Sequence, residues 1–276
     1  MEVDVGLVAQ RDNERAQELA ASLATTLERA AATVVVDETT GRTVERPAVP
    51  VAAMADRDLV VSIGGDGTLL FVAREVGGTP MRGVNLGEVG FLNAVAPADA
   101  IDVATDLVGE LCAGNELDCR ALDRLQATGE GWTIEPALNE VVVHGPRRGH
   151  GGGATLELCV DGNRYTESHA DGILVATPTG STAYNLSEGG PLLHPAADTV
   201  VVTQMAASES MPPLVVDRDA TLTVSVTDAD TALVISDGRN RQELTPPATV
   251  SVAIADDPVR LVGPQVNFFE GLDKLE

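Results

Sequence analysis

A short glycine-rich stretch with a single carboxylate is the part of this chain whose residue types and spacing could do chemistry. It reads Gly64-Gly65-Asp66-Gly67-Thr68. The apolar run 59–63 before it predicts a buried strand that ends in a tight loop, and residues 68–74 predict a helix with Thr68 near its N-cap. Such a loop offers backbone N–H groups and the positive end of a helix to a phosphate. Because Asp66 would repel that phosphate, we expect its carboxylate to accept a proton or to interact with a metal.

A second stretch, rich in hydroxyl groups, follows another short apolar run. It reads Thr177-Pro178-Thr179-Gly180-Ser181-Thr182-Ala183-Tyr184-Asn185-Leu186-Ser187. Residues 172–176 predict the strand that leads into it, and residues 182–187 predict a short helix. Single Ser and Thr residues in turns usually cap the local backbone. Hydroxyl groups at this density, beside an aromatic side chain, are better suited to bind a ribose and a base.

The first part of the chain alternates short apolar strands with helical patterns. The predicted strands are 3–8, 33–37, 59–63 and 81–85, and the predicted helices are 11–31, 68–74 and 98–111. Residues 39–50 carry few apolar side chains and are expected to form a loop. The alternation predicts a parallel sheet in a Rossmann-like α/β domain of residues 1–117. Asp66 would then follow the carboxyl end of a strand, where open α/β sheets bind ligands.

The pattern changes near residue 118 to short strands separated by turn signals such as Asp161-Gly162 and Asp237-Gly238. The predicted strands are 120–126, 137–143, 154–160, 172–176, 199–205, 220–226 and 232–236. Residues 118–261 are therefore expected to form an all-β domain. The tail 262–276 is too short to be a domain and is assigned to the α/β domain.

The composition narrows the classes of function. The formal net charge of the 276 residues is −24, and Lys274 is the only lysine. Binding to nucleic acid is disfavoured, because neutralising its phosphates needs a basic surface. An acidic surface poor in lysine fits a halophilic protein, since concentrated salt screens the self-repulsion. An acidic protein encoded by a GC-rich genome is the alternative interpretation.

The chain also shows no sign of a membrane or secreted protein. No run reaches the roughly 18 apolar residues of a membrane span, and the N-terminus lacks the features of a secretory signal. Cys112, Cys119 and Cys159 have no C-x-x-C spacing, so a metal site and a disulfide framework are both poor interpretations. Buried thiols in a reducing cytosol are the better one, and we expect a cytoplasmic protein.

The glycine loop matches neither of the common phosphate motifs. A Walker A loop needs a Gly-Lys-Ser/Thr end, and the dinucleotide fingerprint would need glycine where Leu70 stands. Together with Asn139-Glu140, residues 177–184 and Gly189-Gly190-Pro191, however, the loop resembles the NAD kinase family. The glycine loop alone is shared with lipid kinases and is similar to that of phosphofructokinases, whereas residues 177–184 are specific. The resemblance extends over most of residues 59–276.

This resemblance implies a Rossmann-like N-terminal domain, a C-terminal β-sandwich and a homo-oligomer, either a dimer or a tetramer. It implies phosphorylation of the 2′-hydroxyl of the adenosine ribose of NAD, which gives NADP. ATP would be the phosphoryl donor, with inorganic polyphosphate as a second candidate, and a divalent cation, Mg²⁺, would accompany it. Asp66 would be the general base for the hydroxyl.

Residue by residue, the resemblance assigns two groups and names no metal ligand. The phosphate loop would be Gly64, Gly65, Gly67 and Thr68. The NAD-binding residues would be Asp66, Gly67, Asn139, Glu140, His150, His169, Asp171, Thr182, Ala183, Tyr184, Asn185, Leu186, Ser187 and Ala206. The chain departs from the family where residues 204–208 replace a usual proline-histidine pair, and where Arg239 replaces a frequent glutamine.

Two other functions compete with an NAD kinase. A lipid or small-alcohol kinase could use the same glycine loop, but residues 177–184 and the lack of a basic amphipathic face argue against it. A non-catalytic dinucleotide-binding sensor would keep the pocket, but it would have no use for Asp66, whose charge makes phosphate binding harder.

The acidic composition leads to a prediction about salt. Raising KCl from about 0.1 M to about 1 M shortens the screening length several-fold and should therefore weaken repulsion within the folded chain. We expect the melting temperature and the activity to rise together over this range, measured by circular dichroism and by NADP formation. A protein that is fully folded and active in dilute buffer would contradict the halophilic interpretation.

Overall fold

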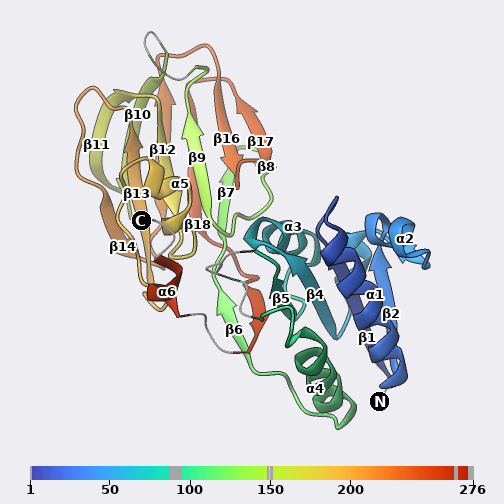
Figure 1. The fold of residues 1–276 in the computed structure, drawn as a ribbon. Coiled ribbons are helices and arrows are strands. Elements are labelled where there is room, and N and C mark those ends of the chain that lie inside the picture. Colours follow the sequence, from blue (N-terminus) through green and yellow to red (C-terminus); the bar gives the residue numbers. More distant parts are fainter. Residues whose placement is uncertain are drawn as a thin grey trace. The chain divides into compact units, whose positions relative to one another are not determined.

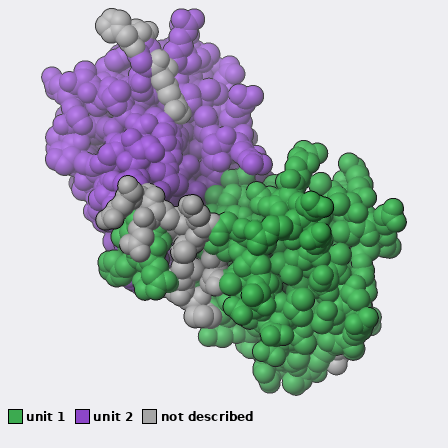
Figure 2. All heavy atoms as spheres, in the orientation of Figure 1, with its two compact units in different colours: residues 1–122, 257–276 green, residues 123–256 purple. Residues whose placement is uncertain are grey.

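The computed structural model describes residues 2–87, 92, 95–147, 149, 152–263 and 267–272. The chain divides into two compact units, residues 1–122 with 257–276 and residues 123–256 (Figures 1 and 2). Two strands, β6 (Cys119–Leu122) and β19 (Val259–Val262), fall mostly within the predicted all-β range but pair with each other in the sheet of the first unit.

The first unit is built around a seven-stranded sheet with the order β3-β2-β1-β4-β5-β19-β6. Its other strands are β1 (Val3–Ala9), β2 (Ala32–Asp37), β3 (Ala48–Val49), β4 (Leu59–Gly64) and β5 (Met81–Asn85). Its helices are α1 (Glu14–Arg29), α2 (Glu38–Val44), η1 (Val51–Met54), α3 (Asp66–Val76), α4 (Ala100–Cys112) and α6 (Phe268–Leu272). Strands β1 to β5 pair in parallel, which confirms the predicted Rossmann-like α/β class.

Helix α1 shows how the sequence pattern produces this unit. Its buried side chains recur at helical spacing and face the sheet core; they are Ala16, Gln17, Ala20, Leu23, Ala24 and Leu27. The side chain of Asn13 caps the helix by accepting a hydrogen bond from the N–H of Ala16 at 3.2 Å. The amphipathic helix predicted over residues 11–31 is therefore confirmed, with its start moved to Glu14 by the cap.

The second unit contains two six-stranded antiparallel sheets (Figure 1). One has the order β11-β10-β15-β18-β7-β8, from β11 (Asn163–Ala170), β10 (Ala154–Val160), β15 (Leu222–Thr227), β18 (Ala248–Ile254), β7 (Leu125–Gly129) and β8 (Trp132–Thr133). The other has the order β14-β13-β12-β9-β16-β17, from β14 (Leu214–Asp217), β13 (Thr199–Met205), β12 (Gly172–Ala176), β9 (Glu140–His144), β16 (Ala232–Ser236) and β17 (Asn240–Leu244).

One apolar core joins the two sheets of this unit. Leu156 and Val224 come from the first sheet, and Val143, Ile173 and Val234 come from the second. All five are fully buried, so the sheets pack face to face as in a β-sandwich. The expected all-β architecture is confirmed.

The sheet that contains β12 is also covered on its other face. Leu174, Val201 and Met205 form a second cluster there with Leu193, and Tyr184 packs against it. The cover is formed by the segment that follows β12, with the 3₁₀ helix η2 (Gly180–Thr182) and the helix α5 (Tyr184–Ser187). Because both faces are covered, β12 is buried along its whole length.

Three details of the predicted elements were wrong. The predicted strand 120–126 is two strands, because β6 pairs with β19 whereas β7 pairs with β18 in another sheet. Helix α3 begins at Asp66 with Gly65 as its N-cap, so Thr68 lies inside the helix. The edge strands β8, β11, β14 and β17 were missed, because β11 and β17 carry many exposed polar side chains and β8 and β14 are only two and four residues long. The interior strands β18 and β19 were missed as well.

The predicted loop 39–50 was also wrong, since it contains α2 and β3. Asp37 caps α2, and its carboxylate accepts hydrogen bonds from the N–H groups of Thr39 at 2.9 Å and Thr40 at 3.3 Å. The Thr40 hydroxyl also donates to this carboxylate. A strong cap can start a short helix in a stretch that has little apolar periodicity.

This cap predicts a loss of stability. Replacing Asp37, which is only 6% exposed, by alanine removes the acceptor for three donors and should lower the free energy of unfolding by about 1–2 kcal/mol. Glu38→Ala, at the exposed first position of the same helix, is the matched control and should change it by a few tenths of a kcal/mol. Equal effects of the two variants in denaturant titrations would contradict the role of the cap.

Candidate active site

The glycine loop lies where the buried strand β4 passes into α3. Gly65 is the N-cap of α3, and its carbonyl oxygen accepts hydrogen bonds from the N–H groups of Thr68 at 3.0 Å and Leu69 at 3.3 Å. Gly64 pairs with Asn85, so the ends of β4 and β5 lie at the same edge of the sheet. The start of an eleven-residue helix is directed to this edge, which suits the binding of an anion.

The three glycines of the loop have different physical roles. A Cβ atom on Gly64 would lie 2.5 Å from the Thr68 hydroxyl oxygen and 3.0 Å from the Cβ atom of Gln10, so only glycine fits there. A Cβ atom on Gly65 or Gly67 would meet nothing within 4 Å. Packing within the described part of the protein therefore explains Gly64, whereas Gly65 and Gly67 leave open space in which a phosphate could approach the backbone.

Asp66 lies within the glycine loop as the first residue of α3, and it is half-buried. Its carboxylate accepts a hydrogen bond from the N–H group of Leu92 at 3.4 Å. The carboxylate thus lies beside the open backbone of Gly65 and Gly67, where it could accept a proton from a bound hydroxyl group. Among the described residues, no three His, Cys, Asp or Glu side chains form a cluster that could hold a metal ion.

Sequence analysis overlooked two neighbours of this loop. The N–H group of Gln10 donates to the carbonyl of Ile63 at 2.8 Å, which places the end of β1 against Gly64. Asn85 lies at the end of β5, and its side-chain oxygen accepts from the N–H of Gly87 at 3.1 Å. Polar residues at the carboxyl ends of predicted strands were the available signal.

The first unit also contains two half-buried arginines that the sequence did not single out, Arg82 on β5 and Arg120 on β6. Burial lowers the pKa of Arg82, and burial together with the charge of Arg82 lowers the pKa of Arg120. Within the described ranges neither forms an ion pair with a carboxylate. They are cations of the first unit that could offset part of the charge of an anionic ligand.

The other predicted site residues belong to the second unit, where Asn139 and Glu140 stand at the start of β9. Thr177 holds this segment through its N–H group, which donates to the Asn139 carbonyl at 3.0 Å, and through its hydroxyl, which donates to the carbonyls of Leu138 at 2.6 Å and Asn139 at 3.4 Å. A Cβ atom on Gly180 would lie 2.0 Å from the Asn139 carbonyl oxygen, so the hydroxyl-rich segment needs glycine to pack here.

The side chains of Asn139 and Asn185 differ in what they contact. Asn185 is 0% exposed, donates to the carbonyls of Ser181 at 3.3 Å and Pro191 at 3.0 Å, and accepts from the Thr203 hydroxyl at 2.8 Å. Asn139 is half-buried, and within the described part of the chain its side-chain amide has no hydrogen-bond partner. Asn139 can therefore reach a ligand, whereas the amide of Asn185 holds the segment 181–191 together.

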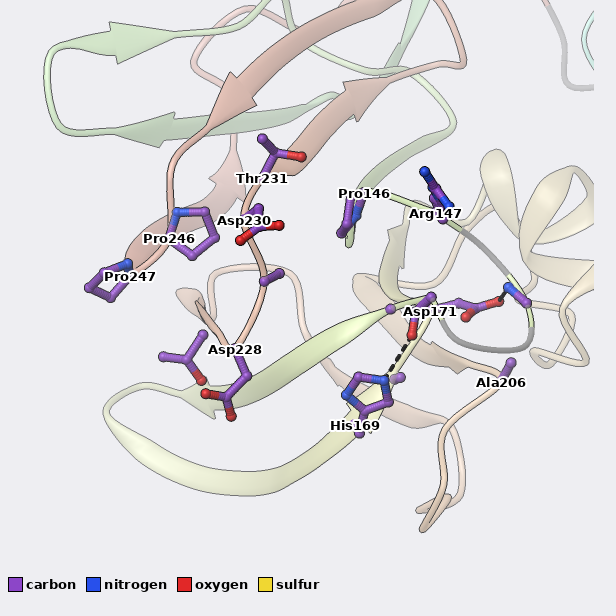
Figure 3. A pocket seen from close by; sticks show the side chains of 16 residues that line it. Pro146, Arg147, His169, Asp171, Ala206, Asp228, Asp230, Thr231, Pro246 and Pro247 are labelled. Carbon is purple, nitrogen blue, oxygen red and sulfur yellow. Dashed lines mark hydrogen bonds between the residues drawn. The ribbon is translucent and has the colours of Figure 1, made fainter.

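A pocket of about 1190 Å³ lies within the second unit, and three of the predicted residues line it: His169, Asp171 and Ala206. In Figure 3 these residues lie on one side of the pocket, opposite Pro246 and Pro247. The Asp171 carboxylate accepts from the N–H of Gly149 at 2.7 Å, and the His169 ring pairs with the Gly152 carbonyl at 2.8 Å.

Several of the predicted NAD-binding residues do not line this pocket. Asn139, Glu140 and residues 182–187 are not part of its lining, and His150 lies outside the described residues. The turn with Asp228 and Asp230 contributes carboxylates that the sequence analysis did not name, and Arg147 adds a cation. The pocket wall is therefore of mixed charge and suited to a polar ligand.

Comparison with known proteins agrees with this arrangement. The ATP-NAD kinase N-terminal domain model matches residues 5–111, and the ATP-NAD kinase C-terminal domain model matches residues 138–263. The NAD kinase of Haloarcula marismortui is 54% identical over 280 residues, which cover 98% of this chain and 99% of that protein. The NAD kinase of Halobacterium salinarum is 48% identical, with 99% of both chains covered.

Solved structures show the same fold. Yeast NADH kinase complexed with NADH superimposes with a TM-score of 0.86 at 23% identity, covering 99% of this chain and 87% of that one. An NAD kinase from Archaeoglobus fulgidus in complex with ATP gives a TM-score of 0.74 at 22% identity, covering 95% and 94%. The two-unit fold and the full-length relatives define a phosphotransferase that acts on nucleotides. The chain belongs to the NAD kinase family.

The glycine geometry predicts opposite effects of two alanine substitutions on stability. Gly64→Ala would force a methyl group against Thr68 and should lower the free energy of unfolding by about 1–3 kcal/mol. Gly67→Ala meets no atom and replaces a helical glycine, so it should leave stability unchanged or raise it by up to about 1 kcal/mol. Denaturant titrations check both, and comparable destabilisation by Gly67→Ala would contradict the open space beside Gly67.

Proposed function

We propose that this chain transfers the γ-phosphoryl group of ATP to the 2′-hydroxyl of the adenosine ribose of NAD, giving NADP and ADP, with Asp66 as the general base. The observation that carries the assignment of Asp66 is its position as the first residue of α3, beside the open backbone of Gly65 and Gly67. A carboxylate at a phosphate-binding helix start hinders binding, so its presence is explained by the chemical step.

The reaction exchanges one phosphorus–oxygen bond for another. The ribose 2′-oxygen forms a bond to the γ-phosphorus, the bond to the bridging oxygen of ADP breaks, and the hydroxyl proton passes to Asp66 and then to solvent. Phosphoryl transfer depends mainly on positioning and on neutralising charge. The first turn of α3 contributes backbone N–H groups for this, and the main task of Asp66 is to orient the hydroxyl toward the phosphorus.

The divalent cation is assigned to the substrate, as Mg²⁺ bound to ATP. Magnesium commonly keeps several water ligands and is held by substrate phosphates with one or two carboxylates, and it withdraws charge from the phosphates. Asp66, at the start of α3 beside the loop, is the described carboxylate that could contact such an ion. Inorganic polyphosphate, the second candidate donor, would bind to the same loop and would not need a site for a nucleoside.

The acceptor is assigned to the second unit. Asn139 is proposed to bind the ribose and adenine side of NAD with its available amide, together with Glu140 and residues 182–187. Asn185 would act indirectly by holding that segment. His169, Asp171 and Ala206 are proposed to contact another part of the dinucleotide in the large pocket. NAD is preferred over NADH because the curated relatives are named NAD kinases, although one structural neighbour is a yeast NADH kinase.

The assembly and the location of the protein are also proposals. We infer a homo-oligomer, a dimer or a tetramer, in the cytoplasm. Within the described ranges, no helix is long and apolar enough to cross a membrane. The resemblance to the family supports the oligomer. The thiols of Cys112, Cys119 and Cys159 are half-buried rather than buried as predicted, and free thiols fit a reducing compartment.

Asp66→Asn tests the chemical assignment. The variant keeps the shape of the side chain but cannot accept a proton, so we expect the rate of NADP formation to fall by about 10²–10⁴-fold in molar KCl, with binding of NAD retained. Glu14→Gln, at the exposed first position of α1, is the matched control and should keep full activity. Full turnover by Asp66→Asn would remove the catalytic role of Asp66. A wild-type protein that binds NAD without forming NADP would favour the sensor.

A further inference from the structure

One carboxylate of the second unit accepts three consecutive backbone N–H groups. The Asp237 side chain accepts from Leu138 at 3.0 Å, from Asn139 at 2.8 Å and from Glu140 at 3.2 Å. The N–H group of Asp237 in turn donates to the Glu140 carbonyl at 3.0 Å. A network of this kind fixes the backbone of residues 138–140 much as an N-cap fixes the first turn of a helix.

The turn between β16 and β17 places this carboxylate. β16 pairs with β9, and Ser236 lies opposite Val141, so the turn that follows reaches the residues just before β9. Asp237 and Gly238 both have positive φ, 46° and 68°, and the N–H of Arg239 donates to the Ser236 carbonyl at 3.1 Å. Positive φ at both central residues is the geometry of a type I′ hairpin turn, for which Asp-Gly is a preferred pair.

The same backbone is held from its other side. Thr177 binds the carbonyls of Leu138 and Asn139, and Gly180 packs directly against the Asn139 carbonyl. With its N–H group bound to Asp237 and its carbonyl bound to Thr177, Asn139 has its main chain fixed. Among the described residues its side-chain amide is without a hydrogen-bond partner, so this is the group that the arrangement leaves for a ligand.

An ionised carboxylate suits the task better than any other side chain of this size. It offers only acceptor lone pairs, on two oxygens, to three donors. An asparagine would keep one acceptor oxygen but turn an NH₂ group toward one of the backbone N–H groups.

We propose that Asp237 is a positioning residue for the dinucleotide, which orients the side chain of Asn139 toward the acceptor ribose and adenine. This inference rests on the proposed role of Asn139 in binding NAD. Asp237 touches neither the substrate nor the reacting atoms in this role. Its loss affects the binding of NAD and leaves the chemical step at the glycine loop unchanged.

The test is the kinetics of Asp237→Asn with NAD varied at saturating ATP. We expect the KM for NAD to rise about tenfold, with kcat and the KM for ATP within about twofold of the wild type, because one or two charge-assisted hydrogen bonds are lost. Asp161→Asn is the matched control. Asp161 also has a positive φ, 47°, and also precedes a turn glycine. Its carboxylate, however, accepts a hydrogen bond from the N–H group of Thr221 at 2.9 Å. This control should leave the KM for NAD unchanged.

A double-mutant cycle with Asn139→Ala separates positioning from a general loss of structure. If Asp237 acts through Asn139, the double variant should have nearly the same KM for NAD as the single variant Asn139→Ala. Additive effects, or a lower melting temperature with an unchanged KM, would overturn the inference. If Asn139→Ala alone leaves the KM for NAD unchanged, the proposed role of Asn139 fails, whatever Asp237→Asn does. If only Asn139→Ala raises the KM, Asn139 keeps its role and the inference about Asp237 fails.

Discussion

The burial of β4 and β12 on both faces is the constraint on which the candidate site depends. Every residue of both strands is buried, and apart from the buried Ser62 of β4 their polar and catalytic candidates come only after the strand ends. At the end of β4 this produces the glycine loop with Asp66, and at the end of β12 it produces the hydroxyl-rich segment. Glycine recurs at or after the end of both strands because the chain packs tightly there, with Gly64 against the side chains of Thr68 and Gln10 and Gly180 against the backbone of Asn139.

The strong negative charge poses a problem for an enzyme with anionic substrates. With a net charge of −24 the mean field of the protein repels both ATP and NAD. Backbone N–H groups and a helix start provide local positive potential without adding charged side chains. A site built from such groups could bind phosphates while the rest of the surface stays acidic.

The acidic side chains do more than keep the surface solvated. Asp37 caps α2, Asp171 holds Gly149 near the large pocket, and Asp237 fixes residues 138–140. In each case a carboxylate accepts backbone N–H groups, and such charge-assisted bonds are stronger than those between neutral groups. An abundance of aspartate thus supplies rigid acceptors at points where loops must hold a defined shape, including the large pocket and residues 138–140 of the second unit.

Local sequence patterns determined the α/β class of the first unit, the β class of the second and the strand–loop–helix around Asp66. Apolar periodicity and glycine act over a few residues, so these features can be read without the fold. The tertiary structure alone separated Gly64 from Gly67 and the buried Asn185 from the available Asn139. It also placed Asp237 against residues 138–140, nearly a hundred positions earlier in the chain. These features depend on strand pairing between distant segments, and no local pattern records which segments meet.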